Sequence, residues 1–250
     1  MQDSIVYAKR IQNSILPNEK FIKKLFPKSL LFYSPKDVVS GDFYWASENN
    51  GIHYFAAVDC TGHGVPGAIM SIVGYNALYT SLVEHQELLP NKVLSEINEF
   101  TYRSLNDQYS DEEVKDGMDM ALISYEPATK KLQFSGAMNP MYLLRGDEVE
   151  VIKGDKRPIG SYNENENEYK MHEFQLKTND RVYVFSDGYP DQFGGERGKK
   201  FMYGKFRKMF NETSHLSMKE QQSHIVKVFN DWLGSKYQQI DDVLVFGFEV

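Results

Sequence analysis

The segment Val58-Asp59-Cys60-Thr61-Gly62-His63-Gly64-Val65-Pro66-Gly67-Ala68 constrains the fold more than any other part of this chain. An apolar run rich in aromatic and β-branched residues, 52–58, precedes it and predicts a buried strand. An apolar-periodic run, 69–82, follows and predicts a helix, with Pro66 near its first position. Asp59 therefore lies where a buried strand ends. A lone acid there is more often a turn or N-cap residue, but an unpaired buried carboxylate is costly and needs partners.

A second acid, Asp42, is expected beside Asp59. The aromatic residues 43–45 predict a strand, and Glu48-Asn49-Asn50-Gly51 predicts a hairpin turn into the strand that ends at Asp59. In an antiparallel hairpin the start of one strand lies beside the end of the next. The two carboxylates should therefore share one sheet end.

Strands and paired helices alternate along the rest of the chain, which predicts an α+β layered fold instead of a doubly wound sheet. Polar tracts at 107–115 and 163–168 predict exposed loops. Further strands are expected at 30–34, 118–125, 131–135, 141–144, 149–152, 172–176, 181–185 and 243–248, and further helices at 4–16, 21–26, 91–105, 205–210 and 218–233.

Two more acids stand at strand ends, Asp187 in Ser186-Asp187-Gly188 and Asp241 just before the last strand. Carboxylates that converge with backbone carbonyls suit hard cations such as Mg²⁺ or Mn²⁺. The sequence has no Cys/His cluster with zinc spacing, no P-loop and no G-x-S-x-G motif. Cys60 lacks a surrounding His–Asp pattern, which disfavours a role as nucleophile.

Composition narrows the class of protein. The 250 residues carry a formal charge of −7, which argues against nucleic acid or an anionic membrane as the main partner. One cysteine fits a reducing compartment, and no apolar run is long enough to cross a bilayer or resembles a secretion signal. We expect a cytoplasmic globular protein with one large or two small domains.

The N-terminal helix, 4–16, has a narrow apolar stripe and ends at Pro17. The stripe is too narrow for a core helix but suits a helix–helix seam, including one between two copies of the chain. We therefore predict that residues 1–26 form a linker or switch segment, continuing an upstream part of a longer parent chain, and that residues 27–250 form the main domain. The stripe comprises Ile5, Ala8, Ile11 and Ile15.

Five motifs, in this order, resemble those of the PPM family of metal-dependent protein serine/threonine phosphatases, in particular the bacterial branch typified by the stage II sporulation phosphatase. The resemblance covers about residues 30 to 250. It implies two stacked antiparallel sheets flanked by helix pairs, with two Mn²⁺ or Mg²⁺ ions at one end. The motifs are Ser40-Gly41-Asp42-Phe43-Tyr44, the segment from Asp59 to Pro66, Pro158-Ile159-Gly160, Ser186-Asp187-Gly188 and Asp241-Asp242-Val243.

The resemblance also implies roles for single residues. Asp59 would bridge the two metal ions and Cys60 would offer its backbone carbonyl. Asp187 and Asp241 would bind one ion, and Asp42 the other, directly or through water. With Asp59 and Asp187 in place, a metal-bound water would attack the phosphorus in line.

Other assignments stay open. Asp119 is a candidate ligand for a third metal or an outer position, but Asp116 competes with it, and a polar turn is an equal alternative. His63 is a candidate general acid, although a histidine between glycines more often orients the loop. Lys36 could contact phosphate or be solvated.

Two segments depart from the family pattern. Trp45 stands where relatives often carry an acid, so one water-mediated ligand could be lost. Ala137-Met138-Asn139-Pro140 replaces a Gly-His-x-Pro-like segment, which puts substrate contacts there in doubt.

The predicted function is a phosphoserine/phosphothreonine protein phosphatase. As the resemblance implies, its substrate would be a phosphorylated regulator of the anti-sigma-antagonist type in a partner-switching pathway, with an upstream sensor. The alternatives are a catalytically silent binding module on the same fold and a small-molecule phosphatase. Retention of the four clustered acids disfavours the silent module.

Overall fold

The computed structural model describes residues 2–106, 114–163 and 167–250. Its long strands form two five-stranded antiparallel sheets, as predicted. The first has the order β1 (Ser29–Ser34), β12 (Val243–Glu249), β9 (Arg181–Phe185), β6 (Met141–Arg145) and β7 (Glu148–Ile152). The second has the order β2 (Phe43–Asn49), β3 (Ile52–Cys60), β4 (Met118–Glu126), β5 (Lys131–Ala137) and β8 (His172–Gln175).

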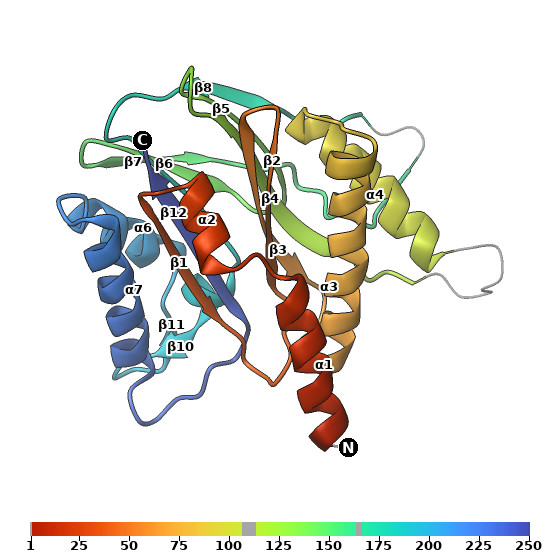
Figure 1. The fold of residues 1–250 in the computed structure, drawn as a ribbon. Helices are drawn as coiled ribbons and strands as arrows, with labels where there is room; N and C mark the ends of the chain where they lie inside the picture. Colours follow the sequence, from red (N-terminus) through yellow and green to blue (C-terminus); the bar gives the residue numbers. More distant parts are fainter. Residues whose placement is uncertain (1, 107–113, 164–166) are drawn as a thin grey trace.

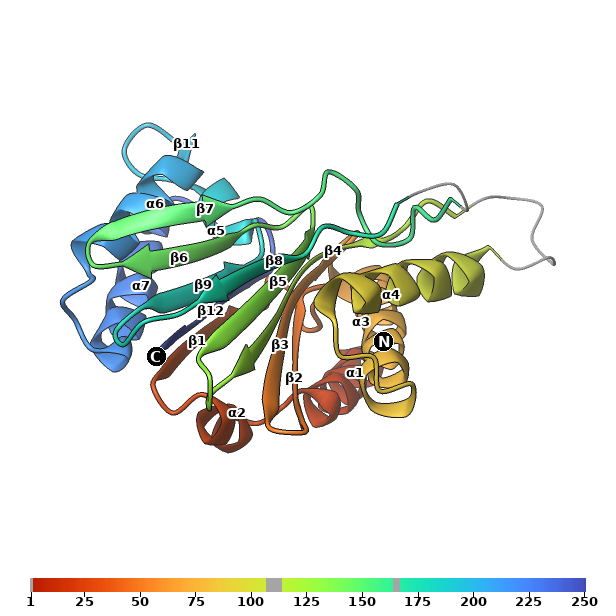
Figure 2. The same cartoon turned by 90° about the horizontal axis from the view of Figure 1, so that it is seen from above.

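Helices cover the outer face of each sheet, which confirms the predicted αββα sandwich (Figure 1). The second sheet is covered by α3 (Gly64–Tyr79), its π-helical extension η1 (Thr80–Glu84) and α4 (Pro90–Leu105). The first sheet is covered by α6 (Tyr203–Glu212) and α7 (Met218–Leu233). Figure 2 shows the two sheets face to face between these helix layers.

The central strands are buried on both faces, so they are apolar throughout instead of alternating. On β3, Phe55 and Ala57 point into the layer between the sheets, whereas Ala56 and Val58 point toward α3 and α4. The ring of Phe55 stacks on that of Phe246 from β12, with 3.6 Å between centroids. Burial of such large aromatic side chains dominates the stability of the core.

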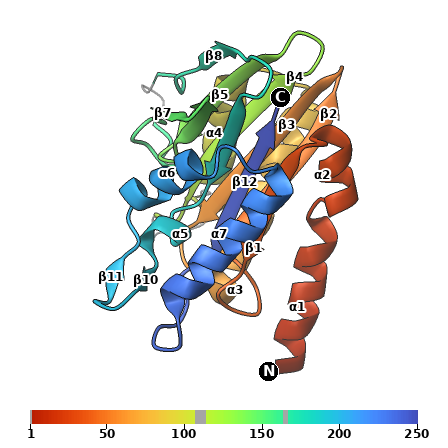
Figure 3. The same cartoon turned by 90° about the vertical axis from the view of Figure 1, so that its left-hand side faces the viewer.

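The two N-terminal helices pack differently. α2 (Glu19–Leu25) is capped by the side chain of Asn18 and places Ile22, Leu25 and the following Phe26 in the core between the sheets. By contrast, most side chains of α1 (Gln2–Ile15) are exposed, and Figure 3 shows this helix extending along the side of the domain away from α2. None of the helices in the described part of the chain combines the length and hydrophobicity needed to cross a membrane.

Three local features differ from the predictions. α3 begins at Gly64, five residues before the expected start at 69, and Pro66 is its third residue, near the start of the helix as predicted. Its first turn carries no apolar periodicity because it faces solvent: Val65 is 48% exposed. The short helix α5 (Gly188–Asp191) and the hairpin of β10 (Phe193–Gly194) and β11 (Lys199–Lys200) went unpredicted, since elements this short show no period. The loop predicted at 107–115 lies mostly outside the described residues, and half of the loop predicted at 163–168 does.

Candidate metal centre

Five strand ends meet at one edge of the sandwich. In the second sheet, Phe43 pairs with Val58 and Asp59 pairs directly with Asp119, so β2 starts, β3 ends and β4 starts at the same place. In the first sheet β9 ends beside the start of β12, since Phe185 pairs with Val245. The acids at these strand ends are thereby gathered, Asp59 and Asp119 within their strands and the others just outside them: Asp42, Asp59, Asp119, Asp187 and Asp241.

Asp42 is the most deeply buried of these acids, with 2% of its surface exposed. One carboxylate oxygen, Oδ2, is fully buried and has no hydrogen-bond partner. Burial raises the pKa of Asp42 well above its usual range, and the carboxylates of Asp242, Asp241 and Asp187 raise it further. A buried, unpartnered carboxylate oxygen among other acids is the environment expected for a cation ligand.

Asp59 and Asp187 face each other across the two sheets. Their side chains are within hydrogen-bonding reach. Burial raises the pKa of Asp59 well above its usual range, followed by the charges of Asp42 and Asp187. Burial also raises the pKa of Asp187, followed by the charge of Asp241. The predicted proximity of Asp42 and Asp59 holds, and the acids from the first sheet join them.

Close backbone contacts bring Asp187 and Asp241 together. A Cβ on Gly188 would lie 1.9 Å from the carbonyl oxygen of Asp242, so only glycine allows the Asp187 turn to approach the start of β12 this closely. The backbone N–H of Ser186 donates to the carbonyl of Leu244 at 3.0 Å. Burial raises the pKa of Asp241, whereas Lys36 and His63 lower it.

The structure separates the two candidates on the 116–120 segment. Asp119 lies directly opposite Asp59 in the β3–β4 register. Burial, followed by the charge of Asp187, raises the pKa of Asp119 to about 6. Asp116 is exposed and precedes the strand. Asp119 is therefore the one that joins the cluster.

The loop after Asp59 is held by glycine contacts. A Cβ on Gly41 would lie 2.5 Å from the Gly62 carbonyl oxygen, and a Cβ on Gly67 would lie 2.3 Å from the same atom. Cys60 is 4% exposed, and its side chain belongs to the core beneath α3 and α4. Burial raises the pKa of its thiol well above the ordinary value, which keeps the sulfur protonated and further disfavours a nucleophilic role.

Two acids near the site, Asp37 and Asp242, were given no role in the sequence analysis. Nδ1 of His63 lies 2.7 Å from Oδ2 of Asp37, and both side chains are about half exposed. The carboxylate of Asp242 accepts the backbone N–H groups of Lys36 and Gly41, both at 2.7 Å, and so fixes the loop that leads to Asp42. The sequence shows two adjacent acids, Asp241 and Asp242. Only the hydrogen bonds show that Asp242 is the one that binds backbone N–H groups.

The segments that depart from the family pattern lie in different places. Trp45 is 3% exposed and packs in the core beneath α3 and α4. Met138 has a positive φ of 64° and is 46% exposed, in the connection between β5 and β6.

The oxygen atoms of the gathered acids decide which metal ions the site could bind. Among the described residues, no three His, Cys, Asp or Glu side chains form a ready-made cage for an ion. Mg²⁺ usually retains several waters and needs only one or two carboxylates, so a complete cage is not required. The unpartnered Oδ2 of Asp42 and the mutual repulsion of the gathered carboxylates fit hard divalent cations.

Comparison with known proteins agrees with this fold. The sequence profile of the stage II sporulation protein E (SpoIIE) family matches residues 50–250. The SiaA-PP2C domain of Pseudomonas aeruginosa is 30% identical, with a TM-score of 0.89 over 100% of this chain and 96% of that one. No curated protein sequence matches the chain.

More distant structures share the fold. The PP2C phosphatase domain of SpoIIE from Bacillus subtilis, solved with a fragment of its regulatory domain, is 20% identical, with a TM-score of 0.66 over 89% of this chain and 63% of that one. RsbX, solved in complex with magnesium, is 12% identical, with a TM-score of 0.59 over 89% and 94% of the two chains. The fold, the gathered carboxylates and the match over most of the chain lead to one assignment: this chain belongs to the SpoIIE family of PP2C-type phosphatase domains.

Proposed function

We propose that this chain is a metal-dependent phosphoserine/phosphothreonine protein phosphatase that uses two Mn²⁺ or Mg²⁺ ions, with a third as an option at Asp119. The observation that carries the proposal is the convergence of buried acids at one edge of the sandwich, with Oδ2 of Asp42 left without a partner. A silent binding module has no evident use for a cluster that destabilises itself by like-charge repulsion.

Each acid then has a role. Asp59 would bridge the two ions, and Cys60 would offer its backbone carbonyl. Asp187 and Asp241 would hold one ion and Asp42 the other. When bound, the ions would activate a water for in-line attack on phosphorus and offset the charge on the phosphoryl oxygens.

His63 is the proposed proton donor to the leaving serine or threonine oxygen. It lies at the start of α3, close enough to Asp241 to lower the pKa of that carboxyl. Asp37, at 2.7 Å from Nδ1, would orient the imidazole so that Nε2 faces the substrate. Lys36, which also lowers the pKa of Asp241, would contact a phosphate oxygen.

Residues 1–26 are proposed to act as a linker and switch, with residues 27–250 as the phosphatase domain. Gln12 supports this role: although α1 is mostly exposed, Gln12 is 5% exposed. Its amide donates to the Ser40 carbonyl at 2.6 Å and to Oγ of Ser71 at 3.0 Å, and accepts the Ser40 N–H at 3.0 Å. α1 thus contacts both the loop that carries Asp42 and the helix that follows the Asp59 loop.

Part of the predicted stripe of α1 is exposed: Ala8 is exposed and Ile11 is 45% exposed, whereas Ile5 and Ile15 are partly buried. We propose that an upstream sensor in a longer parent chain, or a second copy of this chain, packs on this helix. The substrate would be a phosphorylated regulator of the anti-sigma-antagonist type, in the cytoplasm.

The decisive test is hydrolysis of a phosphoserine protein and of a generic phosphate ester, with Mn²⁺ or Mg²⁺ and after chelation. We expect metal-dependent release of phosphate, with the phosphoprotein preferred. Undiminished turnover in metal-free protein would overturn the metal mechanism, and a preference for small esters would favour a small-molecule phosphatase. A comparison with a chain starting at Asn18, in solution mass, activity and metal affinity, tests the switch; identical behaviour would refute it.

A further inference from the structure

A groove of about 470 Å³ opens between the first sheet and the start of α6. One wall is the connection between β5 and β6, with Met138 and Pro140, and the other is the start of α6, with Tyr203. Tyr142 of β6 also lines it, and more of the exposed lining surface is apolar than polar. The groove therefore offers an apolar floor to a segment of a bound partner.

Three cations surround this floor: Lys153, Lys156 and Arg207. All three are exposed, and no acid lines the groove among the described residues. In the described part of the chain none of the three is engaged in an ion pair within 4 Å. In a chain of net charge −7, three unpaired cations around one groove form a local site for negative charge.

The groove is joined to the acid cluster through the start of α6. The backbone N–H of Met202 donates to the carbonyl of Pro190 at 2.7 Å, which ties α6 to the short helix that directly follows Asp187. Tyr203 lies close enough to Asp187 and Asp191 for their charges to act on its hydroxyl. Burial raises the pKa of this hydroxyl, and the two charges raise it further. A chain bound in the groove would thus continue toward the metal centre.

Backbone hydrogen bonds hold the groove in shape. The N–H of Met138 donates to the carbonyl of Asp155 at 2.7 Å, and the N–H of Asp155 donates to the carbonyl of Gly136 at 2.8 Å. Met138 and Met202 both adopt positive φ, at 64° and 75°, a conformation that non-glycine residues rarely hold and that is often found at functional sites. Both methionines are about half exposed, and flexible thioethers adapt to different apolar side chains.

We propose that this groove binds an acidic segment of the substrate protein, next to the phosphorylated residue, and so selects substrates with acidic flanks. The inference rests on the proposed phosphatase function, which it extends from reaction to substrate class. Charge complementarity is its basis: Lys153, Lys156 and Arg207 would pair with carboxylates of the segment while an apolar side chain contacts Met138 and Tyr203.

The test uses synthetic phosphoserine peptides of equal length, with three Asp residues before or after the phosphoserine, and matched peptides with Asn in their place. For the intact chain with Mn²⁺ we expect kcat/KM to be about 10-fold higher for one acidic peptide than for its Asn counterpart, because each of the three exposed charge pairs contributes a factor of about 1.4 to 5. Arg207→Ala should lower this ratio about 3-fold, and the triple variant Lys153→Ala/Lys156→Ala/Arg207→Ala should bring it close to 1. High salt should also shrink the ratio.

Lys208→Ala is the matched control. This neighbouring cation lies outside the groove and pairs with Glu212 on the exposed face of α6, so its loss should leave the ratio unchanged. Equal rates for acidic and neutral peptides, unaffected by the triple variant, would overturn the groove proposal while leaving the phosphatase intact.

A separate binding measurement keeps the two proposals distinguishable. Fluorescence anisotropy of the same peptides on Asp187→Asn protein reports docking without turnover, and we expect the acidic peptide to bind about 10-fold more tightly. If no phosphate ester is hydrolysed but this preference is present, the phosphatase proposal fails and the groove stands as a binding site. Equal binding of the acidic and neutral peptides would refute the groove.

Discussion

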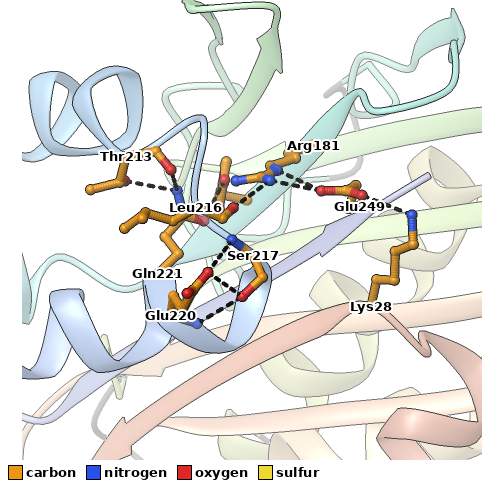
Figure 4. Close-up of polar contacts among 9 residues, drawn as sticks. Lys28, Arg181, Thr213, Leu216, Ser217, Glu220, Gln221 and Glu249 are labelled. Atoms are coloured by element: carbon orange, nitrogen blue, oxygen red, sulfur yellow. Dashed lines mark hydrogen bonds and ion pairs between the residues drawn. The ribbon is translucent and has the colours of Figure 1, made fainter.

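Buried acids at the two ends of the β9–β12 pair have opposite electrostatic environments. At the end far from the metal centre, Arg181 pairs in register with Glu249 (Figure 4). The Arg181 Nε and Nη2 atoms lie 2.9 and 2.7 Å from Oε2 of Glu249, and Nζ of Lys28 lies 2.8 Å from Oε1. At the other end, Asp187 and Asp241 follow and precede the same strands, and burial raises the pKa of both carboxyls although Lys200, Lys36 and His63 act to lower it.

The pKa shifts express this difference. Burial acts to raise the pKa of Glu249, but hydrogen bonds from Lys28 and Arg181 outweigh it and lower the pKa overall. Burial and neighbouring carboxylates raise the pKa of Asp187. One end is thus stabilised by its own cations, whereas the other, under the proposed function, would be stabilised by a bound metal ion. Structural and functional charge can share one pair of strands.

The largest expected effect is on activity at the acid end. Asp59→Asn and Asp187→Asn should each lower kcat at least about 100-fold, because charge stabilisation by a bound metal ion is worth several kcal/mol. Each should leave the metal-free protein as stable as before or more stable, since removal of one acid relieves like-charge repulsion. Unfolding of the metal-free variants in thermal melts would show that these acids are structural.

At the opposite end the effect should fall on stability. Arg181→Leu should reduce the free energy of unfolding by about 3–5 kcal/mol, the usual cost of leaving one partner of a buried ion pair behind. It also removes the donor to the Leu216 carbonyl. Lys28→Ala is the control: its side chain is 60% exposed, so the loss should stay below about 1 kcal/mol. Urea denaturation measures both, and equal losses would break the contrast between the ends.

Gln12 is a neutral residue that connects α1 to the acid end through its hydrogen bonds with Ser40. Gln12→Ala should cost about 1–3 kcal/mol of stability, because the buried N–H of Ser40 loses its partner. It should also weaken Mn²⁺ affinity, measured by titration calorimetry, more than Asn13→Ala, which removes an exposed amide from the next position. Equal metal affinities would leave α1 with a packing role only.

The two ends should respond to pH with opposite sign. Groups with raised pKa at the acid end bind protons more tightly in the folded state, so their contribution is full at low pH and is lost as pH rises. For Asp119 this contribution is lost as the pH rises from about 4, near the ordinary pKa of the carboxyl, through its raised pKa of about 6. Metal-free protein should therefore gain on the order of 1 kcal/mol on acidification from pH 7.5 to 5, allowing for partial exposure.

Glu249 behaves in the opposite way: its contribution is present above its ordinary pKa of 4.5 and falls away only at lower pH. Denaturation of the metal-free protein across this range checks the sign, and Asp119→Asn should flatten the gain. A stability that rises steadily toward pH 7.5 would contradict the assignment of raised pKa values.

The smallest effect is expected at Cys60. Cys60→Ala should keep most of the activity if only its backbone carbonyl takes part, with a modest stability loss from the core. A variant that binds metal and folds but is inactive would instead indicate a role for the thiol.

Local pattern explains which parts of this protein were predictable. Strands and helices long enough to show a period were identified from residues alone, and the hairpin between β2 and β3 sufficed to place Asp42 beside Asp59. Asp187 and Asp241 could be singled out as strand-end acids because each precedes or follows an apolar run. The resemblance then implied two stacked antiparallel sheets flanked by helix pairs, and the structure confirms this architecture.

Contacts between distant segments were decided only by the tertiary structure. The choice of Asp119 over Asp116 depends on the register of β4 against β3, and the pairing of Asp37 with His63 joins two loops. The burial of Gln12 could not be predicted from the sequence of its helix, because its hydrogen-bond partners Ser40 and Ser71 lie in other segments. Periodicity encodes which way a side chain points within its own element, whereas its partner across the fold depends on register and packing, which a local pattern does not contain.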